Sequence, residues 1–254
     1  MSITLEQIKS LRERTGVSTM ACKQTLEETG GDEEKAIELL RKKGEAKAAK
    51  RADRSTNNGV VAIAEGEGKS AILALACETD FVAKNEDFVK AAKGLAQKVL
   101  ENGEDIELTE EVSELTLALG EKIDLKDKKL VEGNHLGTYV HGNNKIGVIV
   151  KLSGETEDEK ERDVAMHVAA MNPKNISPED IADEIVEKEK VIWTDQLKEQ
   201  GKPEEIIGKI MMGKEKKFRE EAALLTQSFV KNPELLIKDF LEDVTVEDFW
   251  RFET

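Results

Sequence analysis

The sequence is poor in cysteine, proline and aromatic residues, and it lacks any long apolar run. Its two cysteines, Cys22 and Cys77, lie far apart with no Cys or His at metal-ligand spacing, which disfavours both a disulfide framework and a zinc site. No stretch approaches the roughly 20 apolar residues that a membrane-spanning helix needs, and the start has no apolar signal core. We therefore expect a cytoplasmic protein with no membrane partner.

Positive charge is outnumbered by negative charge. The formal net charge is -15, and this negative excess repels a nucleic-acid backbone, so direct nucleic-acid binding is disfavoured. Aromatic residues make up 4% of the chain, so the apolar content lies mainly in Ala, Val, Ile and Leu on many small amphipathic elements. For a chain of 254 residues this predicts several thin cores and more than one domain.

Signatures of catalytic sites are missing as well. The segment Gly66–Ser70 ends like a phosphate-binding loop, but Ile63 stands where the Walker pattern needs glycine, and a strand follows instead of a helix. The histidines show no metal-ligand spacing; they are His135, His141 and His167. Cys77 has no local signature of a base or an oxyanion site. We predict no catalytic site, metal or cofactor; a thiol enzyme built around Cys77 is one alternative.

Residues 1–44 carry the start and stop signals of three short helices. Thr4 and Gln7 match a capping box, in which the hydroxyl accepts a backbone N–H and the amide reaches back to the cap. Each helix has a polar residue before it and a glycine after it: Thr4 and Gly16, Ser18 and Gly30, Asp32 and Gly44. We predict a three-helix bundle that binds a partner, with an N-terminal embellishment as the alternative. Residues 45–58 are basic and then polar, which predicts a linker.

The next part of the chain predicts a β-hairpin followed by a helix. Val60–Ala64 and Ala71–Cys77 are short apolar runs separated by a Glu-Gly turn, as in a hairpin. The helix begins near Asn85, carries an apolar stripe and ends at Asn102. Thr109–Leu119 predicts a further helix.

The same order of elements then recurs. Leu136–Val140 and Ile146–Leu152 flank a polar turn and predict a second hairpin, and the helix after it is stopped by Asn172-Pro173. Val244–Phe252 alternates enough to predict an additional strand. A hairpin and then a helix, twice, predicts an α+β fold with two related core subdomains, 59–135 and 136–254, each built on a small antiparallel sheet.

A helical hairpin is expected to interrupt the second subdomain over residues 178–226. Ser177 can cap its first helix and Pro178 suits the first helical position. Two narrow apolar stripes meet at the turn Gly201-Lys202-Pro203, so each arm of roughly 20 residues would extend about 30 Å. We expect this hairpin to protrude, either as a solvated spacer or as a docking arm that could form a homodimer.

The segment Cys77–Asn85 leaves a strand and enters a helix. It places a carboxylate, Asp80, beside a large aromatic, Phe81, at the boundary between two elements. A rigid exposed aromatic is a natural anchor for a pocket on a partner. Spacing alone, however, favours a Phe81 that inserts into its own core.

The letters TDFVAKN after an apolar strand resemble the signature of the elongation factor Ts family, the bacterial guanine-nucleotide exchange factors for elongation factor Tu. The opening LRERTGVSTMACKQTLEETGGDEEKAIELLRKKGEAKAAK resembles the ubiquitin-associated-like bundle of that family. The segments LGTYVHGNNKIGVIVKL, VAMHVAA and WRFET resemble the second core subdomain of the family. The predicted helical hairpin resembles the coiled-coil insertion of the family. Some members have two methionines where this chain has Thr19-Met20, and a C-terminal module found in some members is expected to be absent here.

The resemblance implies three groups of residues that bind elongation factor Tu. Those expected against its G domain, near the Mg²⁺ and the switch region, are Asp80 and Phe81, and the flanking Thr79 and Val82 are expected to bind the partner as well. Those expected against a helix of the same domain are Arg12 and Met20. Those expected against its third domain are Leu119, Gly120, His141 and Gly142.

The resemblance also implies a mechanism. Phe81 would wedge between helices of the partner while Asp80 fixes the approach. GDP would then leave because its Mg²⁺ and phosphate region is disturbed, and GTP could rebind. The partner would be bound in its GDP-bound and nucleotide-free forms. An adaptor or holdase that binds without altering the nucleotide is the alternative function.

Overall fold

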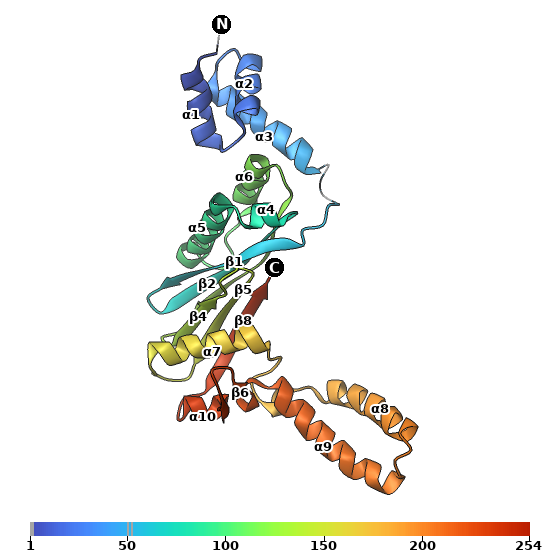
Figure 1. Cartoon of the computed structure of the whole chain (residues 1–254). Coiled ribbons are helices and arrows are strands. Elements are labelled where there is room, and N and C mark those ends of the chain that lie inside the picture. Colours follow the sequence, from blue (N-terminus) through green and yellow to red (C-terminus); the bar gives the residue numbers. More distant parts are fainter. Residues whose placement is uncertain (1–2, 50, 52) are drawn as a thin grey trace. The chain divides into compact units, whose positions relative to one another are not determined.

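The computed structural model describes residues 3–49, 51 and 53–254 (Figure 1). The fold is α+β, as predicted: helices come first, and helices mixed with small sheets follow. Within the described residues the strands form two three-stranded sheets and one two-stranded sheet. The chain divides into two compact units, one of Met1–Glu132, Val140–Gly147 and Phe252–Thr254, the other of Gly133–Tyr139 and Val148–Arg251.

The N-terminal helices form where their capping signals predict them. They are α1 (Leu5–Thr15), α2 (Thr19–Glu28) and α3 (Glu33–Ala49). The capping box is present: the Thr4 hydroxyl accepts the Gln7 N–H at 3.2 Å, and the Gln7 side chain accepts the Thr4 N–H at 3.0 Å. Gly16 ends α1 in the left-handed region, with φ 65°. The helices share a small core in which Leu11, Cys22 and Leu26 are fully buried.

The prediction that α3 ends at Gly44 is wrong, because the helix continues to Ala49. Gly44 instead lies against Leu117 of α6 (Thr109–Leu119): a Cβ at position 44 would be only 2.9 Å from the Leu117 Cδ1. Leu117 packs against the core of the N-terminal helices. The glycine therefore permits a close helix contact here. The first part of the predicted 45–58 linker is helical, and its positions 50 and 52 lie outside the described residues.

The first sheet contains the predicted hairpin. Strand β1 (Asn58–Gly66) pairs antiparallel with β2 (Lys69–Cys77), and Val60 lies opposite Leu75. Helix α5 (Glu86–Asn102) packs on both strands through an apolar stripe that includes the fully buried Phe88 (Figure 1). The Asn85 side chain caps this helix by accepting the Asp87 N–H at 2.8 Å.

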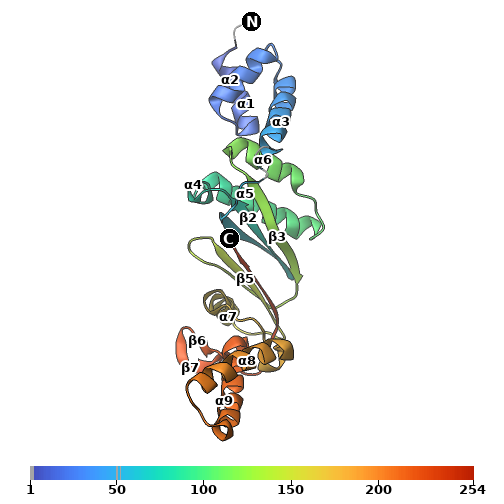
Figure 2. The same ribbon diagram turned by 90° about the vertical axis from the view of Figure 1, so that its right-hand side faces the viewer.

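A third strand of this sheet has no counterpart in the sequence-based prediction. Strand β3 (Ile123–Glu132) pairs antiparallel with β2, beside which Figure 2 shows it, and the sheet has the order β1-β2-β3. Its sequence, IDLKDKKLVE, is rich in charge, and only Ile123 and Val131 are buried. Charged residues suit an edge strand because they discourage pairing with another chain.

The second sheet has the order β4-β5-β8. Strands β4 (Leu136–Val140) and β5 (Ile146–Leu152) have the predicted bounds, and β8 (Val246–Glu253) confirms the predicted C-terminal strand within two residues. Helix α7 (Asp158–Met171) follows β5 and ends at Asn172, which has a left-handed φ of 48°.

The helical hairpin consists of α8 (Asp183–Glu199) and α9 (Glu204–Ala222), which lie side by side. Its start differs from the prediction. Ser177 makes a capping box, but on a 3-10 turn, η1 (Pro178–Asp180), and α8 begins only at Asp183. Ile181 between them is extended and buried, so its side chain anchors the chain at the point where the helix was expected to continue.

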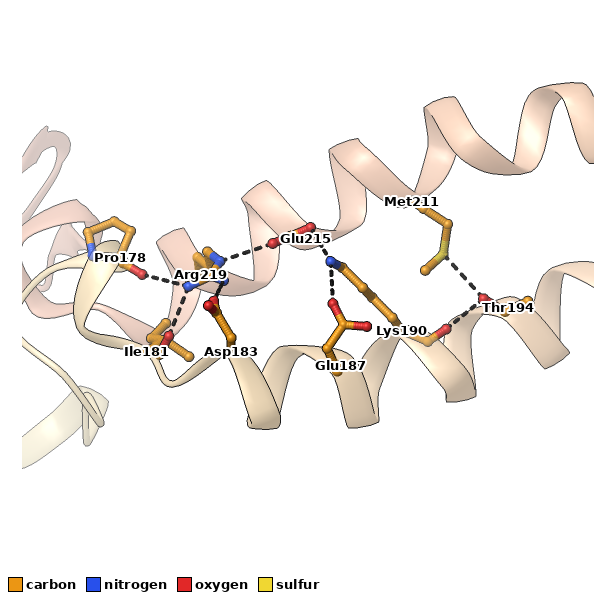
Figure 3. A network of polar contacts seen from close by, with 9 residues as sticks. All are labelled: Pro178, Ile181, Asp183, Glu187, Lys190, Thr194, Met211, Glu215 and Arg219. Carbon is orange, nitrogen blue, oxygen red and sulfur yellow. Dashed lines mark hydrogen bonds and ion pairs between the residues drawn. The ribbon is translucent and has the colours of Figure 1, made fainter.

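A polar network ties the two helices together at their base (Figure 3). The Arg219 guanidinium donates to the carbonyl oxygens of Pro178 at 3.3 Å and Ile181 at 2.9 Å. It also binds the carboxylates of Asp183 at 2.7 Å and Glu215 at 3.2 Å. Arg219 therefore joins the end of α9 to the start of α8.

Further along the hairpin, Lys190 of α8 binds Glu187 of its own helix at 2.8 Å and Glu215 of α9 at 2.9 Å. Trp193 and Phe218 meet edge to face with their ring centroids 5.5 Å apart. Polar and aromatic contacts thus alternate along the seam.

After α9 the chain passes through four short elements before β8. These are η2 (Leu224–Thr226), β6 (Ser228–Phe229), β7 (Asn232–Leu236) and α10 (Ile237–Leu241). None of the helices in the described parts of the chain is long and apolar enough to cross a membrane.

Candidate partner-binding site

The site begins where β2 ends. Thr79 is extended, and it caps the short helix α4 (Asp80–Ala83) by accepting the Val82 N–H at its hydroxyl, at 3.4 Å. Phe81, in the middle of α4, is 83% exposed. The expectation from spacing that Phe81 inserts into its own core is therefore wrong. Val82 and Ala83 take the inward positions and pack against the core beneath α5.

A carboxylate from another part of the chain holds the start of α4. Glu121, between α6 and β3, accepts the Thr79 N–H at 3.0 Å and the Thr79 hydroxyl at 2.6 Å. In the neighbouring contact, Glu78 accepts the Lys122 N–H at 2.7 Å and the Arg54 guanidinium at 3.1 Å. The Lys122 N–H and the Arg54 guanidinium hold the pKa of Glu78 below its usual range, so it is ionised at neutral pH.

Asp80 is half exposed and forms an ion pair with a lysine. Its carboxylate binds Lys84 at 2.7 Å. The hydrogen bond and charge of Lys84 lower the pKa of Asp80, and the charge of Lys145 adds to this effect. Asp80 thus presents an ionised acceptor directly next to Phe81.

Cys77 lies buried beneath α4. Its Sγ donates to the Thr79 carbonyl at 3.2 Å, and burial, with the charge of Glu121, raises the pKa of the thiol to about 11. A nucleophilic cysteine needs the opposite environment, one that favours the thiolate. These contacts argue against the thiol enzyme considered above.

The remaining features singled out for chemistry have structural partners. The Gly66–Ser70 segment is the turn and first pairing of the β1-β2 hairpin, and Lys69 donates to the Leu100 carbonyl. His167 is buried and bonded to Gln227, and His135 lies 3.8 Å from a Glu161 oxygen. Searched over the described residues, the structure shows no group of three or more His, Cys, Asp or Glu that could hold a metal.

The sequence model of the elongation factor Ts family matches residues 78–254. The chain belongs to this family. It is therefore a translation elongation factor. The match starts at Glu78, directly before the capping residue of α4, and includes Glu121. Arg12 and Met20 lie outside it, so their assignment depends on the resemblance of the N-terminal sequence alone.

In this elongation factor Ts family member, two more of the expected contact residues, Leu119 and Gly120, directly precede Glu121 in the sequence. Leu119 packs against the core beneath α5, and Gly120 ends α6 in the left-handed region with φ 76°. The turn at Gly120 directs Glu121 to Thr79.

His141 and Gly142 lie in the turn between β4 and β5. The His141 N–H donates to the Ile146 carbonyl at 2.9 Å, and a Cβ on Gly142 would meet no atom within 4 Å. The same turn carries Lys145, whose charge reaches Asp80. The turn therefore contributes to the electrostatics of α4.

Arg12 and Met20 lie on the N-terminal helices, and both are exposed, Met20 to 67%. These helices contact α6 through Leu117 and through an ion pair of 2.8 Å between Arg41 and Glu114. The N-terminal helices that carry Arg12 and Met20 have a core separate from the one beneath α4, and α6 packs against both cores.

The sequence reasoning missed Glu121, Glu78, Arg54 and Lys84. Lys84 was detectable, since it follows Asp80 by four residues, a spacing that brings opposite charges together on a helix. Glu121 follows a glycine that ends a helix, but nothing local shows that it returns to Thr79.

Proposed function

We propose that this protein is a guanine-nucleotide exchange factor for elongation factor Tu. It binds the GDP-bound and nucleotide-free forms of its partner and promotes GDP release, so that GTP can rebind. The observation that carries the proposal is the exposure of Phe81, which is 83%, on a helix whose start is held by two hydrogen bonds from Thr79 to Glu121.

An exposed aromatic side chain on a well-supported helix, such as Phe81 on α4, suits a binding anchor. Aromatic side chains are frequent among the few residues that dominate binding energy. An anchor that is already ordered loses less conformational entropy on binding than a flexible one. Phe81 stands on α4 while Val82 and Ala83 fix that helix to the core below.

The proposed mechanism is thermodynamic coupling. A protein that binds the nucleotide-free partner more tightly than the nucleotide-bound partner must weaken the nucleotide by the same factor. Phe81 would insert near the Mg²⁺ and phosphate region of the partner, with the ionised Asp80 beside it. Loosening of the metal removes charge neutralisation from the phosphates and so speeds release.

Further contacts would increase affinity without touching the nucleotide region. We assign Arg12 and Met20 to a helix of the partner's G domain, and the two turns at Gly120 and Gly142 to its third domain. Contacts on several surfaces of one partner add through effective concentration, provided that all of them can engage at once.

Release of fluorescent GDP from purified elongation factor Tu tests the proposal. Phe81→Ala should keep the fold and slow stimulated release at least tenfold, since an aromatic hot spot is worth about 2 kcal/mol or more. Leu235→Ala, which truncates another exposed apolar residue on β7, is the matched control and should leave release unchanged. Undiminished stimulation by Phe81→Ala would refute the role of Phe81, and binding without any stimulation by the wild type would support the adaptor alternative.

A further inference from the structure

Helix α4 is too short to hold its own position. It spans only Asp80–Ala83, and short isolated helices are unstable in water. Its backbone bonds close a single turn, from the Ala83 N–H to the Thr79 carbonyl at 3.2 Å and from the Lys84 N–H to the Asp80 carbonyl at 3.1 Å. The direction of Phe81 therefore depends on contacts from outside the helix.

The polar contacts from outside converge on Thr79, in addition to the apolar packing of Val82 and Ala83. Glu121 accepts both donors of this residue, its N–H at 3.0 Å and its hydroxyl at 2.6 Å. Thr79 is also the cap of α4, because its hydroxyl accepts the Val82 N–H. One carboxylate thus fixes both the backbone and the side chain of the residue from which α4 starts.

The lower side of α4 covers the buried thiol of Cys77. The Cys77 Sγ donates to the Thr79 carbonyl at 3.2 Å, and Ala83 lies in the same buried core cluster as Cys77. Thr79 and Ala83 are the two ends of the α4 turn. Displacement of the turn should therefore expose this thiol to a reagent, so that thiol reactivity reports on the position of α4.

We propose that Glu121 is a positioning residue that locks α4 over Cys77 and so fixes the direction of Phe81 before any partner binds. The consequence for exchange rests on the function proposed above, in which Phe81 contacts elongation factor Tu. The lock itself is a property of the free chain and can be measured without a partner.

Loss of the lock has a specific kinetic signature. A partner that needs one direction of Phe81 binds only the fraction of molecules in which α4 is in place, so the affinity falls by that fraction. Once bound, α4 is held by the partner and Phe81 acts as before. Removal of Glu121 should therefore raise the concentration of exchange factor needed for half-maximal GDP release and leave the maximal rate unchanged, whereas Phe81→Ala lowers the maximal rate.

The lock is tested first by amide hydrogen exchange of the full-length chain. Glu121→Ala should speed exchange at Ala83 and Lys84 about tenfold, since it removes two hydrogen bonds to a charged acceptor. Glu121→Gln keeps one carbonyl oxygen, which can accept one of the two Thr79 donors, so its effect should be smaller. Amides in the middle of α5 serve as the internal reference. Glu132→Gln neutralises an exposed carboxylate at the other end of β3 and should change nothing.

Alkylation by iodoacetamide is the second measurement. Mass spectrometry follows Cys77 and Cys22 separately in the same molecules, and Cys22, buried in the N-terminal helices, reports on any general loosening. Cys77 should react about tenfold faster in Glu121→Ala while Cys22 keeps its rate. Loss of the Glu121 charge also lowers the pKa of the Cys77 thiol, which by itself would speed alkylation. Hydrogen exchange is not affected by the thiol pKa. Only an increase in both rates therefore shows that α4 has moved.

The outcomes separate the two proposals. Unchanged exchange at Ala83 and unchanged alkylation of Cys77 in Glu121→Ala would overturn the lock. A lost lock with an unchanged half-maximal concentration would overturn the positioning role. If Phe81→Ala leaves GDP release intact, the function proposed for Phe81 fails, and hydrogen exchange still decides whether Glu121 holds α4. Should Glu121→Ala fail to fold, as judged by urea unfolding, Glu121→Gln carries the same tests.

Discussion

The two hairpin-and-helix repeats follow one plan but use their polar groups differently. In the first, Thr79 and Glu121 lie near the surface and support an exposed residue, Phe81. In the second, the fully buried His167 on α7 contacts the chain as it returns from the helical hairpin. The first repeat therefore places its hydrogen bonds beside an exposed aromatic residue, whereas the second uses them to hold the segment that follows the helical hairpin.

The His167 contact has a defined tautomer. The Val230 N–H donates to Nδ1 at 3.2 Å, so Nδ1 must be the acceptor and Nε2 carries the proton. Nε2 then donates to the Gln227 Oε1 at 3.0 Å. A neutral imidazole satisfies both partners, while a charged one would set a second N–H against the Val230 N–H.

Among substitutions that test this difference between the two repeats, His167→Ala should have the largest effect on stability. It removes a buried ring and leaves the Val230 N–H without its acceptor, which should lower the free energy of unfolding by about 2–4 kcal/mol. Urea unfolding followed by circular dichroism measures the change. GDP release at a temperature where the variant is folded should stay near the wild-type rate; a variant of full stability would show that the second repeat does not depend on its buried polar centre.

A smaller effect is expected from Arg219→Ala at the base of the helical hairpin. The Pro178 and Ile181 carbonyls lose a charged donor, and a destabilisation smaller than that of His167→Ala should follow, concentrated at the start of α8. Hydrogen exchange should rise there and stay unchanged in α4. Arg219→Lys keeps the charge but cannot make the same set of contacts, so it should rescue only part of the loss. An equal rise at α4 would contradict the view that each repeat is supported by its own contacts.

The smallest effect is a pH dependence. Burial lowers the pKa of His167 from its usual value, only partly offset by the Gln227 hydrogen bond. The stability that comes from the neutral ring is therefore fully present above the unfolded pKa of about 6.5 and is lost as the pH falls through the folded pKa. Urea midpoints between pH 7 and pH 5 should fall more steeply for the wild type than for His167→Gln. Parallel slopes would mean that His167 does not titrate on unfolding.

Local signals were enough for most of the elements. The capping box at Thr4, the paired apolar runs around Glu65 and the Asn85 cap each depend on neighbours in the sequence, and all three formed as predicted. Residue spacing did not predict the exposure of Phe81, because a large apolar residue is usually buried. Only the family resemblance indicated that this side chain is exposed.

The features that the sequence did not reveal depend on distant contacts. Strand β3 has too much charge to be recognised, and only pairing with β2 makes it a strand. Gly44 resembles a helix stop until Leu117 is seen beside it. Glu121 and Thr79 are 42 positions apart, and no local pattern joins them.

The clamped helical hairpin has a mechanical consequence. Arg219 fastens its base, and Lys190 bridges to Glu215 further out, so the two helices resist sliding past one another (Figure 3). The hairpin therefore behaves as a rigid arm, and each helix is about 25 Å long. A force applied at the Gly201 turn would be transmitted along this arm to its base. The bending would then fall on the non-helical joints at Ile181 and Ala223, both of which are buried.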